Sequence, residues 1–100
     1  MPFNQFTPRN FTNDAVQTYA PMMSGVYGIS NAREWIYIGE SDNIQSSLLT
    51  HLHEMNSQLK KHAPTGFVFE VCDEAHRTAR QNRLVVEYGP SCNRLAPQNS

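Results

Sequence analysis

The chain has 100 residues, of which 39% are hydrophobic and 17% are charged. This composition is typical of one small globular domain, and it excludes a disordered chain. No apolar run approaches the roughly 20 residues that a membrane-spanning helix needs. The N-terminus lacks the basic segment followed by an apolar segment that marks a secretory signal. We therefore expect a soluble, cytoplasmic protein that does not bind membranes.

The charges nearly balance, since eight Lys and Arg face nine Asp and Glu, for a net charge of −1. Proteins that hold nucleic acid through its phosphates usually carry a basic excess, because neutralised phosphates supply most of the affinity. Any binding to nucleic acid is therefore expected to be weak. The composition identifies neither another partner nor the oligomeric state.

The two cysteines, Cys72 and Cys92, do not have the spacing of zinc ligands. Disulfides are rare in the cytosol, where thiols are kept reduced. We therefore expect both thiols to be free, with a Cys72–Cys92 bond as the alternative.

The first residues, 1–13, are predicted to form an extended arm. At least one of its three phenylalanines is expected to pack on the domain: Phe3, Phe6 or Phe11. The alternative is a partly disordered terminus. Asn13 or Asp14 would cap the short helix that follows, because both side chains accept hydrogen bonds from first-turn amides. Pro21 ends this helix.

Two short segments rich in aromatic and β-branched residues predict a β-hairpin. They span residues 25–29 and 34–38, and the turn-forming sequence Ser-Asn-Ala-Arg separates them at residues 30–33. Strands so close in sequence pair with each other. The hairpin therefore brings Tyr27 and Tyr37 near each other on neighbouring strands.

A long helix is predicted over residues 43–58. Gly39 ends the preceding strand, and Ser41 or Asp42 is suited to be the N-cap of this helix. Its apolar face is marked by residues at helical spacing: Ile44, Leu48, Leu52, Met55 and Leu59.

A third strand is predicted over residues 67–72, where the side chains of one face are strongly apolar. Asp73 caps a second long helix over residues 74–88, and Gly89 and Pro90 stop it. The element order is thus a short helix followed by β-β-α-β-α.

This order predicts an α/β (α+β) fold, in which helices flank a small three-stranded sheet with at least one antiparallel pair. We expect residues 1–23 to form an N-terminal arm with the short helix, residues 24–93 to form the domain, and residues 94–100 to form a polar tail.

Two tripeptides point to a known family: Gly25-Val26-Tyr27 and Tyr37-Ile38-Gly39. Asn43 and His51 follow them, and Pro90 and Asn93 follow the last predicted helix. Over residues 24–93, this pattern resembles the GIY-YIG nuclease family, with Val in place of Ile in the first tripeptide. The resemblance implies the same β-β-α-β-α fold.

The family hydrolyses phosphodiester bonds with one divalent metal. A Glu on its last helix holds the metal, an Arg four residues before the His stabilises charge on the phosphate, and tyrosine helps to activate the water. The resemblance therefore implies catalytic positions for Tyr27, Tyr37 and His51. Ser47 stands at the position of the Arg, and Gln81 stands at the position of the Glu.

Both departures from the family remove a charge. Mg²⁺ prefers negatively charged oxygen ligands, whereas Gln81 offers a neutral carbonyl. A transferring phosphoryl group needs a fixed cation, whereas Ser47 offers a hydroxyl. We therefore expect no metal ligand and no cofactor. If the chain is nevertheless a nuclease, we expect it to need Mg²⁺ or Mn²⁺.

Three other charged residues are candidates to replace the missing charges. Glu40 directly follows the second tripeptide, and Arg77 and Arg80 flank Gln81. We take Arg77 and Arg80, together with Asn43, as candidate binding residues. The alternative is that these charges lie on the surface and pair locally.

Three hypotheses of function follow. The favoured one is a catalytically degenerate GIY-YIG domain that acts as a binding or interaction module. Its pocket would be formed by five converging side chains: Tyr27, Tyr37, Ser47, His51 and Gln81. The second is an active, divalent-metal-dependent DNA endonuclease with rearranged ligands. The third is a small structural or oligomerising domain, so the sequence leaves open whether the chain is an enzyme.

Overall fold

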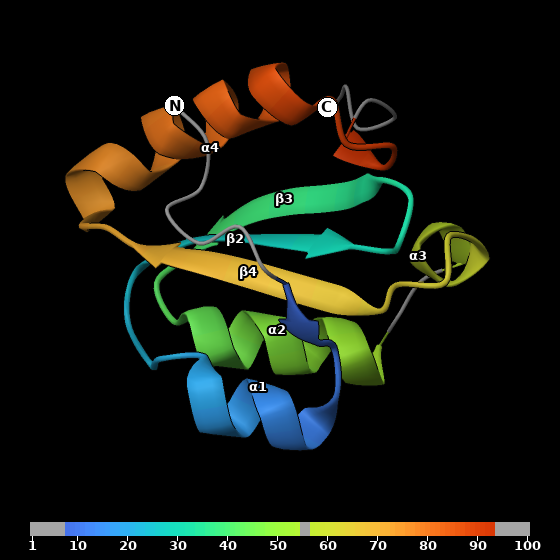
Figure 1. The fold of residues 1–100 in the computed structure, drawn as a ribbon. Helices are drawn as coiled ribbons and strands as arrows, with labels where there is room; N and C mark the ends of the chain where they lie inside the picture. Colours follow the sequence, from blue (N-terminus) through green and yellow to red (C-terminus); the bar gives the residue numbers. More distant parts are fainter. Residues whose placement is uncertain (1–7, 55–56, 94–100) are drawn as a thin grey trace.

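A four-stranded antiparallel sheet lies at the centre of the molecule (Figure 1). The computed structural model describes residues 8–54 and 57–93. The strands are β1 (Arg9–Asn10), β2 (Gly25–Ser30), β3 (Trp35–Ser41) and β4 (Gly66–Val71), and their order in the sheet is β1-β4-β2-β3. The helices are α1 (Asn13–Tyr19), α2 (Ile44–His53), α3 (Ser57–Lys61) and α4 (Glu74–Tyr88).

Helices cover both faces of this sheet. In Figure 1, α1 and α2 lie below the sheet and α4 lies above it. The predicted α+β class, with an antiparallel sheet and flanking helices, is confirmed. In the described part of the chain, no helix has the length and apolar character needed to cross a membrane.

The sheet has one strand more than the three predicted. The additional strand is β1, whose Arg9 and Asn10 pair with Phe67 and Gly66 of β4. A strand of two residues is too short to show an alternating pattern, so the sequence carries no signal for it.

The described residues before β2 pack on the rest of the molecule. β1 pairs with β4, and α1 lies beside α2 (Figure 1). Phe11 is 7% exposed and belongs to the core, which confirms that one phenylalanine of the arm docks. Phe3 and Phe6 lie outside the described residues. The division of the chain into arm, domain and tail stays a prediction.

β3 continues past Gly39, where it was expected to end, and reaches Ser41. Ser41 still pairs with Gly25 of β2. Neither Ser41 nor Asp42 is therefore the N-cap of α2. The side chain of Asn43 takes that place and accepts an amide of the first turn.

The other helix ends follow the expected chemistry more closely. Thr12 caps α1, one residue before the predicted Asn13 or Asp14. α4 begins and ends where predicted, with Asp73 as its N-cap and Gly89 as its C-cap. Gly89 has a φ of 58°, in the left-handed region, which glycine adopts without the steric cost of a side chain.

α2 is shorter than predicted. It ends at His53 rather than at residue 58, and a separate helix, α3, begins at Ser57. The break allows Leu59, which is 3% exposed, to reach the core. Met55 lies outside the described residues.

Two apolar cores lie on the two faces of the sheet. The core on the side of α1 and α2 includes Phe11, Val16, Ile29, Ile36, Ile44, Leu48 and Phe67. The core on the side of α4 is made of Val26, Ile38, Val68 and Leu84. Successive residues of a strand point to opposite faces, so the same three strands contribute to both cores.

The segment after α4 closes the outer edge of β3. The amide of Cys92 donates to the carbonyl of Ile36 at 2.8 Å. Asn93 uses its side chain instead, since its Oδ1 accepts from the amide of Ile38 at 2.6 Å and its Nδ2 donates to the carbonyl of Ile38 at 2.9 Å. Backbone groups at the edge are thus satisfied without a further strand. Cys72 and Cys92 are free thiols, as predicted.

Truncation of Leu84 to Ala should lower the free energy of unfolding by about 2–5 kcal/mol, because this side chain is fully buried beneath α4. Urea denaturation followed by the emission of Trp35 measures the loss. Val86→Ala is the matched control on the same helix. Val86 is 86% exposed, so the control should change stability by no more than about 0.5 kcal/mol. Equal losses in the two variants would contradict the orientation of α4.

Candidate functional site

Tyr27, Tyr37 and His51 come together on the sheet face that α2 covers. Tyr27 pairs with Gly39 and Ile29 pairs with Tyr37, so both tyrosine rings project from the same face of the hairpin. His51 reaches them from α2. The Tyr27 hydroxyl and His51 Nε2 share a hydrogen bond of 2.8 Å.

The three rings are in mutual contact. The ring centroids lie 6.2 Å apart for Tyr27 and Tyr37, 5.6 Å apart for Tyr27 and His51, and 5.3 Å apart for Tyr37 and His51. We call these three residues the Tyr-His cluster. The sequence predicted that they converge, and the structure brings them together; their role stays a prediction.

Gly39 makes room for the Tyr-His cluster. A Cβ atom at position 39 would lie 2.5 Å from the hydroxyl oxygen of Tyr27 and 2.8 Å from Cε2 of Tyr37. Real Cβ atoms do not approach other atoms so closely, so any other residue would displace the rings. Steric exclusion therefore explains why the last residue of the second tripeptide is a glycine.

Burial keeps the Tyr-His cluster uncharged. It raises the pKa of Tyr27, with a smaller contribution from Tyr37. It also raises the pKa of Tyr37, where Cys92 and Glu40 add to the effect. Burial lowers the pKa of His51. All three side chains are therefore neutral near pH 7, and neither tyrosine is available as a phenolate base.

Ser47 and Asn43 hold the start of α2 instead of joining the Tyr-His cluster. The Ser47 hydroxyl donates to Oγ of Ser41 at 2.6 Å. The Ser41 hydroxyl in turn donates to the carbonyl of Asn43 at 2.8 Å and accepts its amide at 2.9 Å. These contacts fasten α2 to the end of β3, which is a structural role.

The first amides of α2 are occupied as well. Those of residues 44 and 45 donate to carbonyls of the loop before β2, at 2.9 and 3.0 Å. Those of residues 46 and 47 donate to the side chain and the carbonyl of Asn43, at 3.0 and 3.1 Å. Free amides at a helix N-terminus commonly bind phosphate. These four amides are therefore not free to hold one.

Gln81 lies on α4, and its side chain contacts the outer edge of β3. Its Nε2 donates to the carbonyl of Ile38 at 3.1 Å, and the Asn93 side chain donates to the same carbonyl at 2.9 Å. Ile38 is the neighbour of Tyr37 along β3. Gln81 therefore lies beside the strand that carries Tyr37, but among the described residues its hydrogen bond goes to the backbone.

The groups around Gln81 do not fit a divalent metal. A hard cation needs negatively charged oxygen ligands, whereas the Gln81 amide is neutral and its NH₂ group faces a carbonyl. Within residues 8–54 and 57–93, no three His, Cys, Asp or Glu side chains are grouped as metal ligands.

Each of the charged residues that were candidates for compensation is in an ion pair. Arg77 Nε donates to Glu40 at 3.0 Å, and the Thr78 hydroxyl lies 3.0 and 2.8 Å from the two oxygens of that carboxylate. Arg80 makes two hydrogen bonds with Glu70, at 2.6 and 2.8 Å. These pairs link α4 to the sheet. A part in ligand binding for the two arginines stays a prediction.

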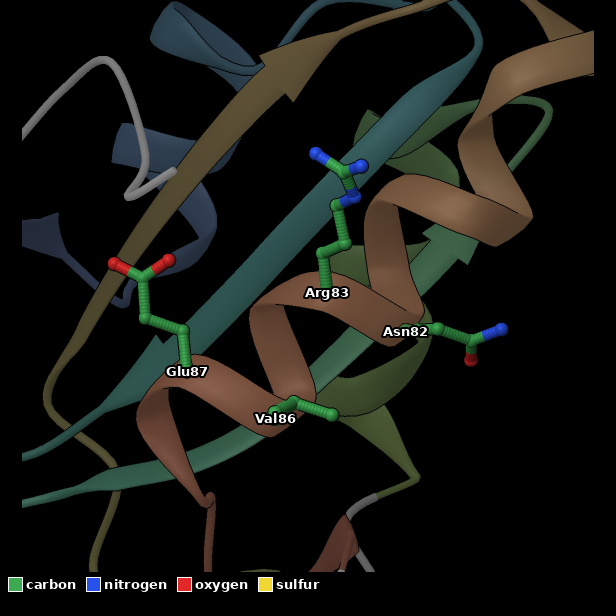
Figure 2. A pocket seen from close by; sticks show the side chains of 4 residues that line it. All are labelled: Asn82, Arg83, Val86 and Glu87. Carbon is green, nitrogen blue, oxygen red and sulfur yellow. The ribbon is translucent and has the colours of Figure 1, made fainter.

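A cavity of about 480 Å³ lies on the outer surface of α4, on the far side of the sheet from the Tyr-His cluster (Figure 2). Four side chains of α4 line it: Asn82, Arg83, Val86 and Glu87. Figure 2 shows Arg83 and Glu87 projecting to one side of the helix, whereas Asn82 and Val86 project to the other. The predicted site residues are not among them.

Comparison with known proteins identifies this architecture. No protein-family model matches the chain, and no curated protein matches it. The crystal structure of the GIY-YIG N-terminal endonuclease domain of UvrC from Thermotoga maritima, bound to its catalytic divalent cation, magnesium, is similar with a TM-score of 0.67. The match covers 80% of this chain and 97% of that chain, at 21% sequence identity. The chain has the GIY-YIG endonuclease fold.

Structures of two tyrosine-to-phenylalanine mutants of that UvrC domain, each bound to the catalytic divalent cation, are similar to the same degree. Their TM-scores are 0.66, at 21% and 20% identity, and each match covers 80% of this chain and 96% of that chain. The GIY-YIG-like fold that the two tripeptides indicated is confirmed. At this identity, the likeness shows the fold alone.

Two partners at the site were missed in the sequence. Ser41 holds Ser47, and the carbonyl of Ile38 holds Gln81. The sequence did contain a signal for the contact between Ser41 and Ser47. Alternation along β3 puts Ser41 on the same face as Tyr37, toward α2. No sequence pattern reveals which backbone carbonyl a side-chain amide will find.

The substitution Gly39→Ala should cost about 1–3 kcal/mol of folding free energy, because its Cβ would overlap the Tyr27 ring. Urea denaturation measures the loss. The control is the same substitution in a Tyr27→Leu background, where the overlapping hydroxyl is absent. There, Gly39→Ala should cost less, as a double-mutant cycle would show. Equal costs in both backgrounds would contradict the steric role of Gly39.

Acidification should destabilise the fold through His51. Its pKa in the folded chain lies below the ordinary value of 6.5, so the stability that the neutral ring contributes is present above that pH and is lost as the pH falls through the folded pKa. Between about pH 7.5 and 5.5, His51→Gln should therefore lose less stability than the wild type. The exposed His53→Gln is the control, and identical pH dependences in all three proteins would refute the assignment.

Proposed function

We propose that the chain is a catalytically degenerate GIY-YIG domain, which binds a ligand or partner at the Tyr-His cluster and does not hydrolyse phosphodiester bonds with a metal. The observation that carries this proposal is the amide of Gln81. It stands at the family's metal-binding Glu position and donates to the carbonyl of Ile38 at 3.1 Å. A carboxylate would be repelled by that carbonyl, so the local structure is built for an amide.

The residue at the family's Arg position supports the proposal, because it supplies no fixed cation for a phosphate. Ser47 replaces the family's Arg, and its hydroxyl is bound to Ser41 at 2.6 Å. Arg77 and Arg80 are held by carboxylates on the α4 side of the sheet. Stabilising a phosphoryl transition state requires preorganised positive charge.

The cluster keeps one polar group for a ligand. Among the described residues, no group forms a hydrogen bond with the Tyr37 hydroxyl, whereas the Tyr27 hydroxyl is bound to His51. The Tyr37 ring is half-buried, so it offers an apolar face together with a hydroxyl. With a net charge of −1, this site favours a neutral ligand or peptide over a polyanion such as DNA.

A cytoplasmic location is part of the same proposal. Cys72 and Cys92 are both free thiols. Free cysteines are usual where thiols are kept reduced, as in the cytosol.

The purified protein should leave supercoiled plasmid intact in Mg²⁺ or Mn²⁺, because loss of one electrostatic stabiliser commonly costs about 100- to 1,000-fold in rate and here two charges are missing. Agarose gels measure nicking. If the wild type nicks the plasmid and Tyr37→Phe does not, the proposal is overturned and the active endonuclease with rearranged ligands takes its place.

The charge-restoring variant Ser47→Arg with Gln81→Glu is the companion control. Calorimetric titration of Mg²⁺ should detect no binding to the wild type tighter than about millimolar, and tighter binding to the variant. The two single variants separate the contributions of the cation and the carboxylate. Thermal unfolding checks that each variant is folded, since Ser47→Arg removes the hydrogen bond to Ser41.

A further inference from the structure

In the described part of the chain, the outer edge of β4 is open beyond β1. Because β1 pairs with Phe67 and Gly66, no described strand lies beside the rest of β4, from Val68 to Val71. Pro8 does not continue β1 along this edge. A Cβ atom at Gly66 would lie 2.9 Å from Cβ of Pro8, which also lines a cavity at the turn between β2 and β3. The described chain therefore turns away from the edge at Pro8.

Phe69 and Val71 present their backbone groups to this open edge. The groups of successive residues in a strand point alternately to its two neighbours. The amide of Cys72, just after β4, donates to the loop before β2 at 3.0 Å, whereas the carbonyl of Thr65, just before β4, accepts the amide of Phe11 on the β1 side at 2.9 Å. Odd-numbered residues of β4 therefore point outward. Within residues 8–54 and 57–93, the N–H and C=O groups of Phe69 and Val71 have no partner, so they can pair with a further strand.

Exposed apolar side chains gather at the same end of β4. Apart from Val86 on α4, the exposed large apolar residues of the described chain are Tyr19, Met22, Met23 and Val71. The Arg9 guanidinium lies 3.9 Å from the centroid of the Tyr19 ring, so the end of α1 lies beside β1. The loop with Met22 and Met23 runs from there to the start of β2, which pairs with Val71. The open edge thus borders clustered apolar side chains, which commonly mark a binding surface.

Acidic side chains flank these apolar residues. Glu74 follows β4, and Asp42 precedes α2, where the amide of Ile44 donates to the carbonyl of Met23 at 2.9 Å. Glu74 and Asp42 are both exposed, and neither forms an ion pair with a described residue. The two arginines at the start of α4 are already paired with other carboxylates. This end of the molecule therefore complements a basic group on a partner.

A second copy of the chain fits this edge poorly. A two-fold pairing of β4 with β4 of another copy that used all the free groups of Phe69 and Val71 would set Glu70 opposite its own equivalent. Like charges directly opposite each other destabilise a pair of strands. The edge of β3 is blocked at Ile38, where Asn93 binds both backbone groups. These two constraints favour a segment of a different protein over self-association.

We propose that the outer edge of β4 binds an extended peptide segment of a partner protein, which adds to the sheet antiparallel to β4. The residues opposite Val71 and Phe69 are apolar, because their side chains face the side of α1 and α2. A basic residue precedes them and lies near Glu74 and Asp42. In such an added strand, main-chain hydrogen bonds supply affinity and alternate side chains supply specificity. The Tyr-His cluster takes no part, because β2 and β3 separate its Tyr37 from this edge.

The peptide Lys-Lys-Val-Thr-Val-Thr with a C-terminal fluorophore is the probe, and fluorescence anisotropy should show saturable, one-to-one binding. Methylation of its two valine amide nitrogens removes the backbone donors but keeps the side chains, and should weaken binding about tenfold. Replacement of Lys-Lys by Glu-Glu should weaken it to a similar degree. Equal binding of the three peptides, or no saturable binding up to about millimolar protein, would overturn the proposal.

Variants locate the binding. Val71→Pro removes the outward N–H of position 71, which bonds to no described residue, whereas Val71→Ala keeps it. The dissociation constant should rise about tenfold more with Val71→Pro than with Val71→Ala. Glu74→Lys should also weaken binding, and Glu54→Lys, which changes an exposed acid at the end of α2, is its matched control. Equal effects within either pair of variants would overturn the site. Thermal unfolding confirms that each variant is folded.

Sedimentation velocity tests the other occupant of this edge. The wild type should sediment as a monomer at the concentrations of the peptide titration. A dimer that Val71→Pro abolishes and Val71→Ala keeps would assign the edge to a second copy of the chain, and the peptide proposal would be overturned.

Discussion

The antiparallel pairing of β2 with β3 is the constraint on which both faces of the molecule depend. Its register sets Tyr27 opposite Gly39, and position 39 has no space for a side chain. Along β3, Tyr37 then points toward α2 and Ile38 points toward α4. A slip of β3 by one residue would exchange these directions and put Tyr37 on the face where Leu84 packs. The Tyr-His cluster therefore depends mainly on the hairpin, which places both tyrosines, and then on α2, which adds His51.

Arg77 and Arg80 form ion pairs that hold α4 on the sheet. The side chains of Arg77 and Glu40 are 19% and 28% exposed, and those of Arg80 and Glu70 are 16% and 13% exposed. Pairs this far from water are costly to break, because removal of one partner leaves the other buried and uncompensated. Both pairs join α4 to the sheet, so the two arginines contribute to that attachment.

The sequence predicted α4 residue for residue, because Asp73 and Gly89 encode its ends locally. The aromatic and β-branched residues predicted the hairpin, but β3 continues to Ser41, past its predicted end at residue 38. The early end of α2 at His53 was not predicted, because it depends on how the chain after α2 brings Leu59 into the core. At the site, the tripeptides and His51 were sufficient to predict that Tyr27, Tyr37 and His51 come together, whereas Ser47 and Gln81, which were expected to join them, do not. The hydrogen bond from Gln81 to the carbonyl of Ile38 could not be predicted from the sequence, because it depends on how α4 packs on β3.

Asn93 also affects how the molecule behaves among its own copies. An exposed edge strand offers unpaired backbone groups to a neighbouring chain, which is a common route to aggregation. Here one side-chain amide occupies both the N–H and the carbonyl of Ile38, so β3 cannot add a strand at that point. Loss of the residues after α4 would free the N–H and the carbonyl of Ile38, and it would also remove Pro90 and Cys92, which are buried. The same few residues therefore protect the sheet edge from a neighbouring chain and help to fill the core.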